Sequence, residues 1–199
     1  MVEATQIMTG LSDWDLVAQA RGGDMDSFAR LVHRYEAPLI HFCFRMVGSH
    51  QDAQDLAQES FVRVYRYLDR LKPEAKFSTA LFGMARNLTL NYLRDAGRRG
   101  RGKVRSLTRE DETDSAVADD VHRPDREARL REIEGILERA LDSLTPEHKE
   151  VLVLREIQGM DYDAIAAIVR CRKGTVKSRL ARAREQLRVR LIELGGELL

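Results

Sequence analysis

The chain has 199 residues and a formal charge of only +1, because 33 lysines and arginines are balanced by 32 aspartates and glutamates. Its hydrophobic content of 43% is enough to bury the cores of one or two small helical domains. The sequence has no apolar run of membrane-spanning length, and residues 1–15 lack the basic and apolar regions of a signal peptide. We therefore expect a cytoplasmic protein without membrane insertion.

The cysteines and histidines do not indicate a metal centre or a disulfide framework. Cys43 and Cys171 lie in unrelated segments, without CxxC or Cys/His ligand spacing, and we expect both to be small buried side chains. The five histidines are scattered, and the sequence contains no glycine-rich phosphate loop. We therefore expect no metal, no cofactor and no enzymatic activity.

Apolar residues recur with helical periodicity almost throughout, which predicts an all-α fold. Residues 1–97 are expected to form a first domain of four helices. The predicted limits are a Ser12 cap and a Gly22-Gly23 end for the first helix, a stop near Gly48 for the second, Ser49 to Leu71 for the third, and Ser78 to Gly97 for the fourth.

Residues 98–125 change in composition to small, polar and charged side chains that could not bury a core, which predicts a flexible linker. Residues 126–199 are expected to form a second helical domain. Within it, Thr145 and Pro146 predict a helix start, and Gly159 predicts the end of that helix.

Residues 161–187 have the pattern of a helix-turn-helix whose second helix is rich in cations. Val176 and Leu180 are expected to pack against a first helix that buries Ile165, Ala166, Ile168 and Val169. Many such turns have glycine where this chain has Arg170, so Arg170 must adopt a left-handed conformation at a cost of about 1–2 kcal/mol, or the turn must avoid one. The basic helix suits a DNA major groove, whereas a solvated cationic helix is the plainer alternative.

Three stretches together resemble the extracytoplasmic-function group of bacterial RNA polymerase sigma factors. They are DAQDLAQESFVRVYRYLDRL at 52–71, FSTALFGMARNLTLNYLR at 77–94, and LTPEHKEVLVLREIQGMDYDAIAAI at 144–168 with KGTVKSRLARAREQLR at 173–188. The resemblance covers both predicted domains in order. It implies core RNA polymerase and promoter DNA as partners, with an anti-sigma factor as a further candidate. If such a factor exists, the free chain is expected to fold its two domains together and hide both basic surfaces.

The resemblance also implies a contact with the polymerase on the third helix. Its polar side chains at helical spacing could pair with basic partner residues, although an ordinary solvated face is the alternative. These side chains are Asp52, Asp55, Gln58 and Glu59.

For the −10 element, the resemblance implies a pocket and nearby phosphate contacts on the fourth helix and the loop before it. The pocket would admit an extruded base, and cations would hold phosphates. The residues are Leu71, Lys76, Met84, Ala85, Arg86, Asn87, Arg94 and Arg98. Asn87 is the favoured base reader; its alternative is an amide that ties the loop to the helix. Ala80 stands where the family usually has tryptophan, so Phe77 and Phe82 are expected to supply part of the aromatic packing.

For the −35 element, the resemblance implies readers on the second helix of the helix-turn-helix: Arg172, Lys173, Thr175, Lys177, Ser178, Arg179 and Arg182. Early residues are expected to contact bases and later arginines to contact phosphates. The sequence thus predicts a promoter-specificity subunit of RNA polymerase. The alternatives are a stand-alone helix-turn-helix transcriptional regulator and a helical enzyme.

Overall fold

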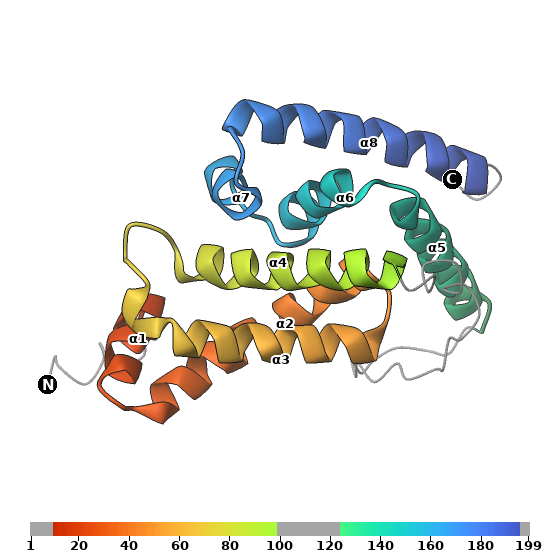
Figure 1. Cartoon of the computed structure of the whole chain (residues 1–199). Helices are drawn as coiled ribbons and strands as arrows, with labels where there is room; N and C mark the ends of the chain where they lie inside the picture. Colours follow the sequence, from red (N-terminus) through yellow and green to blue (C-terminus); the bar gives the residue numbers. More distant parts are fainter. Residues whose placement is uncertain (1–9, 99–123, 196–199) are drawn as a thin grey trace, which may run out of the picture.

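The computed structural model describes residues 10–98 and 124–195, with the side chains of 124–128 and Leu130 left aside (Figure 1). Every regular element in these ranges is a helix, and the helices form two domains, as the periodicity predicts. The predicted linker, apart from its two ends, lies outside the described residues.

The N-terminal domain consists of α1 (Asp13–Arg21), α2 (Met25–Val47), α3 (His50–Arg66) and α4 (Phe77–Arg98). Its helices start at polar caps: Ser12 and Asp15 form a capping box at α1, and the Ser49 hydroxyl accepts a hydrogen bond from the Asp52 amide. Gly48 ends α2 in a left-handed conformation that costs glycine little.

The third helix is shorter than predicted. It ends at Arg66, and a 3₁₀ turn, η2 (Leu68–Arg70), follows before the chain becomes extended at Leu71. The proline-based stop signal therefore marks the end of this turn rather than the end of the α-helix. Residues 71–76 then form a loop that leads into α4.

The C-terminal domain consists of α5 (Pro124–Asp142), α6 (Pro146–Leu152), the π-helical segment η4 (Val153–Ile157), α7 (Tyr162–Val169) and α8 (Lys173–Gly195). Thr145 is the N-cap residue of α6 and Pro146 begins the helix, as predicted, but the Thr145 side chain makes no capping hydrogen bond; its carbonyl accepts the first helical hydrogen bonds, from the amides of His148 and Lys149. Asp161 caps α7 through its side chain, which accepts from the Ala164 amide at 2.7 Å.

Arg170 forms the turn of the helix-turn-helix in the left-handed conformation, with φ 55° and ψ 48°. It is the one non-glycine residue with positive φ in the described part of the chain. A turn that avoids the left-handed conformation is therefore excluded. The left-handed backbone of Arg170 carries a strain of about 1 kcal/mol or more.

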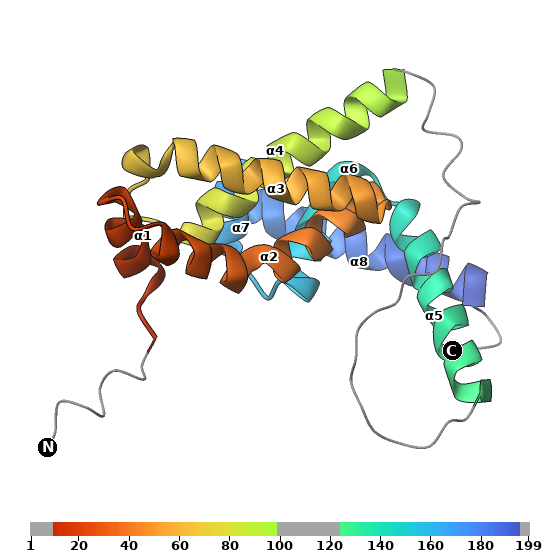
Figure 2. The same ribbon diagram turned by 90° about the horizontal axis from the view of Figure 1, so that it is seen from below.

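The two domains pack against each other, with α4 lying against α7 and α2 against α6 (Figure 1). Buried side chains from both domains form one continuous hydrophobic cluster. Figure 2 shows that the C-terminal end of α4 projects on one side of this body, and that α5 and the C-terminal end of α8 extend from it on another. The two domains are therefore folded together, in what we call the closed arrangement. The two basic surfaces are not hidden as expected, because Arg94 and Arg98 on α4 and Arg172 and Arg182 in the helix-turn-helix remain exposed.

Phe77 and Phe82 both take part in aromatic packing in the core. The Phe82 ring packs on Phe42 with centroids 5.5 Å apart, and the Phe77 ring packs on Tyr35 with centroids 5.6 Å apart. One expectation about buried side chains needs correction. Cys43 is buried as expected, and burial raises the pKa of its thiol to about 12, but Cys171 is only half-buried.

Candidate polymerase and promoter interfaces

The acidic stripe of α3 lies on the surface of the N-terminal domain. Asp55 and Gln58 are exposed, and Glu59 is half-buried and bonded to Arg63 at 2.8 Å. Asp52 differs from the others, because its carboxylate accepts a hydrogen bond at 2.7 Å from the Tyr92 hydroxyl of α4. The structure therefore leaves Asp55 and Gln58 fully accessible and Asp52 and Glu59 half-buried, and it gives Asp52 a role in packing α3 on α4.

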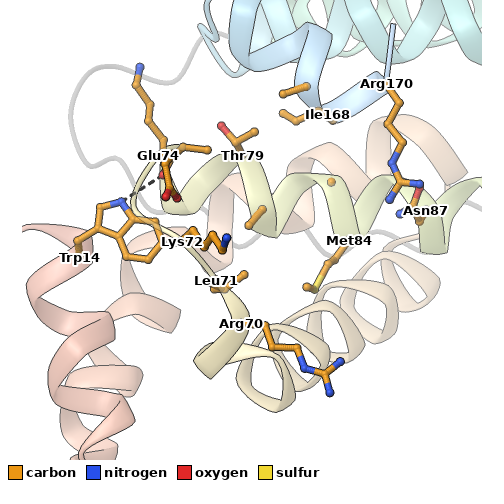
Figure 3. A pocket seen from close by; sticks show the side chains of 15 residues that line it. Trp14, Arg70, Leu71, Lys72, Glu74, Thr79, Met84, Asn87, Ile168 and Arg170 are labelled. Atoms are coloured by element: carbon orange, nitrogen blue, oxygen red, sulfur yellow. Dashed lines mark hydrogen bonds between the residues drawn. The ribbon is translucent and has the colours of Figure 1, made fainter.

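A pocket of about 410 Å³ lies between the loop at 71–76 and one face of α4 (Figure 3). Four of the predicted −10 residues line it: Leu71, Lys76, Met84 and Asn87. The same face of α4 also bears three small residues that line the pocket beside Met84: Thr79, Ala80 and Gly83. The pocket thus combines apolar walls with an amide that can both donate and accept hydrogen bonds.

Ala85 does not belong to this pocket. Its side chain is fully buried in the core, since one step along the helix from Met84 turns it away from the pocket face. Arg94 and Arg98 are exposed further along α4, and the Arg94 guanidinium is bonded to the Asn91 side chain.

Arg86 is predicted to contact a phosphate, but in the structure its side chain is turned into the boundary between the two domains. Its guanidinium forms a bidentate ion pair with Glu150 of α6, with Nε–Oε2 at 2.7 Å and Nη2–Oε1 at 3.0 Å. The Arg86 side chain is only 14% exposed and that of Glu150 is fully buried. Arg179 of α8 approaches the same carboxylate at 3.8 Å. Two predicted DNA-binding arginines, one from each domain, therefore converge on a single acid.

Burial raises the pKa of the Glu150 carboxyl above its usual value, while the hydrogen bond and charge of Arg86 and the charge of Arg179 act in the opposite direction. The desolvation of the carboxylate thus outweighs its attraction to the two arginines. A buried ion pair of this kind adds little net stability even when its geometry is good. The contact therefore determines the relative orientation of the two domains but adds little to the stability of the closed arrangement.

The predicted −35 residues of α8 fall into three groups. Lys173 is bonded to Asp163 at 2.7 Å, and the Lys177 ammonium lies 5.8 Å from the centre of the Tyr162 ring, so both are engaged by α7. Arg179 turns toward Glu150. Arg172 is exposed directly before α8, and on α8 itself Ser178 and Arg182 are exposed and Thr175 is half-buried; Lys173 and Lys177 are exposed as well, despite their contacts.

The helix-turn-helix covers one side of the α4 pocket. Ala167, Ile168 and Arg170 line the pocket opposite α4, and Figure 3 shows the Arg170 side chain pointing toward Asn87. Lys76 adds an ion pair to Asp161 at 3.0 Å across the same boundary. In this closed arrangement, α7 covers one side of the pocket in which the sequence analysis expects the −10 contacts.

Sequence reasoning missed several residues of these sites, among them Trp14, Thr79, Glu150 and Arg170 as pocket or interface residues. A usable signal existed for Glu150, which precedes Leu154 by four residues and so shares its buried helical face. Trp14 gave no local signal, because α1 reaches the pocket only through the tertiary packing.

The described residues contain no group of three or more histidine, cysteine, aspartate or glutamate side chains placed to hold a metal ion. In the same ranges no helix is long and apolar enough to cross a bilayer.

Comparisons with known proteins agree with this division into domains. The sigma-70 region 2 family matches residues 31–99, and the sigma-70 region 4 family matches residues 134–187. The chain is 35% identical over 185 residues to the RNA polymerase sigma-H factor of Pseudomonas aeruginosa, covering 91% of this chain and 94% of that protein. It is 35% identical over 178 residues to the ECF RNA polymerase sigma-E factor of Salmonella typhimurium, covering 89% and 93%.

Among solved structures, CnrH in complex with the cytosolic domain of CnrY is similar, with a TM-score of 0.66 and 26% identity over 89% of this chain and 95% of that one. Relatives at this level of identity that extend over nearly the whole chain establish its ancestry. The protein belongs to the extracytoplasmic-function group of the sigma-70 family of RNA polymerase sigma factors.

Proposed function

We propose that this sigma factor reads the −10 element of a melted promoter strand in the pocket between residues 71–76 and α4. The observation that carries the proposal is that Asn87 and Met84 of α4 line one pocket together with Leu71 of the loop. A base that leaves the stack needs apolar contact in place of stacking, and it needs hydrogen bonds to its exposed edge. Met84 and Leu71 offer the first, and the Asn87 amide offers the second.

The remaining roles follow from the exposed side chains. Asp55, Gln58 and Glu59 on α3 form the contact with core RNA polymerase, where their negative charge favours a basic partner surface. Arg172, Thr175, Ser178 and Arg182 contact the −35 element, and Lys173, Lys177 and Arg179 join them once DNA replaces their present partners. Arg94 and Arg98, with Lys76 and Arg86 after opening, hold phosphates near the −10 element.

The closed arrangement must open before both DNA elements can be bound. α7 occupies one side of the −10 pocket, and Glu150 holds Arg86 and draws Arg179 toward it. Core polymerase would favour the open form if it binds the two domains at separate sites, because a ligand shifts a two-state equilibrium toward the state that it prefers. Sigma factors act by such binding and are not in general enzymes.

An anti-sigma protein that favours the closed form would have the opposite effect. The similar CnrH was solved in complex with a cytosolic domain of another protein, which supports a protein partner for this chain. A pull-down from native cells that recovers core polymerase alone would count against such a partner. The same experiment on fractionated cells would check our expectation that the chain is cytoplasmic.

The test of the reading pocket uses transcription by core polymerase and this chain, with no other factor. The templates are a duplex promoter and one premelted across the −10 region. Asn87→Ala should remain unable to discriminate the −10 base on the premelted template, even if total transcription partly recovers, because premelting removes the unpairing cost of a few kcal/mol but cannot replace a lost base contact.

Asn91→Ala is the matched control, since Asn91 lies one turn further along α4, exposed and outside the pocket. Wild-type discrimination by Asn87→Ala would show that Asn87 only ties the loop to the helix. Failure of core polymerase and the wild-type chain to start specific transcription would favour a stand-alone regulator instead.

A further inference from the structure

The segment that joins α3 to α4 is fastened to α1 near both of its ends. Arg21, in the last turn of α1, donates from Nε and Nη2 to the Leu68 carbonyl at 3.0 and 2.9 Å, and its Nη2 also donates to the Leu71 carbonyl. Trp14, in the first turn of α1, donates from its indole Nε1 to the Ala75 carbonyl at 3.2 Å. One short helix thus holds the beginning and the end of the loop that forms a wall of the −10 pocket.

These contacts occur where the loop has little other support. Residues 71–76 lie between η2 and α4, and all of them except Leu71 are exposed. The Leu68 carbonyl already accepts a hydrogen bond from the Leu71 amide within the 3₁₀ turn, and Arg21 adds a charged donor to it. The Leu71 carbonyl lies outside the helices, where a backbone acceptor needs another donor, and hydrogen bonds from a charged guanidinium are stronger than those between neutral groups. Arg21 therefore fixes the point at which the chain leaves the 3₁₀ turn, directly at Leu71.

Trp14 also lines the pocket itself, together with Leu71, Lys76 and Ala80. Figure 3 shows its ring beside the loop, with the indole nitrogen directed at the loop backbone. The hydrogen bond to Ala75 restrains the loop next to Lys76, one residue before α4 begins. The two anchors leave Leu71 and Lys76 little freedom to shift relative to Met84 and Asn87.

We propose that Arg21 and Trp14 are positioning residues for −10 recognition, which hold the 71–76 loop at the distance from α4 that the extruded base requires. The inference rests on the proposed function of the pocket. It predicts that loss of either anchor reduces discrimination of the −10 base while polymerase binding and −35 binding are unchanged, because neither residue lies on α3 or in the C-terminal domain.

The experiment measures transcription by the reconstituted holoenzyme on premelted templates that differ only in the −10 base, at saturating template. Arg21→Ala should lower the ratio of preferred to unpreferred base by about tenfold, which corresponds to the loss of one or two charge-assisted hydrogen bonds. Arg21→Lys, which keeps the charge but not the fork of donors, should restore part of that ratio. Trp14→Phe removes the indole donor and keeps an aromatic ring, and it should lower the ratio by about threefold.

Arg34→Ala is the matched control. Arg34 also ties α1 to the domain, through Asp13 and the Leu11 carbonyl, but it does not touch the loop. It should lower the thermal midpoint about as much as Arg21→Ala and leave base discrimination at the wild-type level. Equal loss of discrimination in Arg34→Ala would overturn the proposal, because general loosening of α1 would then suffice.

The remaining outcomes separate this inference from the function on which it rests. If Asn87→Ala loses discrimination and the Arg21 and Trp14 variants keep it, the pocket reads the base and the anchors do not position it. If Asn87→Ala also keeps discrimination, the pocket assignment itself is wrong. Should Arg21→Ala fail to fold, Trp14→Phe decides, and wild-type discrimination by that variant overturns the proposal.

Discussion

Arg86 and Glu150 form a bidentate ion pair across the boundary between the two domains, although they are 64 residues apart in the chain. Arg179 lies 3.8 Å from the same carboxylate, so one buried acid neutralises cations from α4 and α8. Both arginines carry charge that DNA binding would use. The closed form therefore keeps them occupied by an internal anion in place of phosphate.

Replacing Glu150 with lysine should open the chain, because a third cation would lie between Arg86 and Arg179 in a site that water does not reach. We expect a larger radius of gyration in small-angle X-ray scattering and faster binding to promoter DNA. Glu156→Lys is the control, since Glu156 pairs with Arg184 inside the C-terminal domain and is half exposed. A Glu150→Lys protein that is folded and as compact as wild type would show that apolar packing alone holds the domains together.

The closed form should also depend on pH. Burial raises the pKa of the Glu150 carboxyl. The closed form therefore binds the carboxyl proton more tightly than an open form in which the carboxyl is hydrated. The stabilisation is therefore present in acid and is lost as pH rises through the raised pKa. The radius of gyration should increase as the pH rises from the ordinary pKa of a glutamate through the raised pKa of Glu150, and it should stay constant, at the compact value, in Glu150→Gln. If the wild-type chain instead opens in acid, the attraction of the Glu150 carboxylate to Arg86 and Arg179 outweighs both its burial and its repulsion by Glu147.

Reversing the charge of Asp55 and Glu59 together to lysine should abolish binding to core polymerase, measured by co-purification or by fluorescence anisotropy. The thermal midpoint should change little, because Asp55 is exposed, Glu59 is half-buried, and substitutions on the surface usually cost less than about 0.5 kcal/mol. Glu36→Lys makes the same charge change at an exposed site on α2 and should bind normally. Loss of helical content in the double variant would mean that the stripe supports the fold.

Arg182→Ala should weaken binding to duplex −35 DNA, by about 1–3 kcal/mol if Arg182 reads a base edge. If Arg182 contacts only a phosphate, binding to all DNA sequences should weaken alike. The slope of log affinity against log salt concentration should then decrease in magnitude by about one. Arg184 is the control two residues away, because it is bonded to Glu156 within its own domain. Equal effects of the two alanine substitutions on specific binding would refute the assignment of the outer face of α8.

Arg170→Gly should stabilise the C-terminal domain by about 1 kcal/mol, because glycine adopts the left-handed conformation of this turn without steric strain. Urea unfolding would measure the gain, with Arg172→Gly as a control at a position without positive φ. If both substitutions destabilise the protein, contacts of the Arg170 side chain with the N-terminal domain outweigh the relief of strain.

The sequence by itself determined the helices, the helix-turn-helix and the family. Helical periodicity, caps such as Ser12 and Ser49, and the Gly48 stop depend on neighbours within a few residues, so they can be recognised without the fold. The same local logic raised a left-handed Arg170 as one of two possibilities for the turn, and the structure decided between them. The face of α4 that bears Met84 and Asn87 could likewise be anticipated from spacing and resemblance.

Only the tertiary structure decided which of these side chains are free to act. Arg86 looks like a phosphate contact from its place on α4, but its partner Glu150 lies in the other domain. Ala85 looks like a pocket residue, but one helical step turns it into the core, while Trp14 enters the pocket from a helix whose sequence does not indicate it. Such contacts depend on how amphipathic helices that are far apart in the chain pack on one another. Local periodicity shows that a helix face is buried, but it does not show which element covers that face.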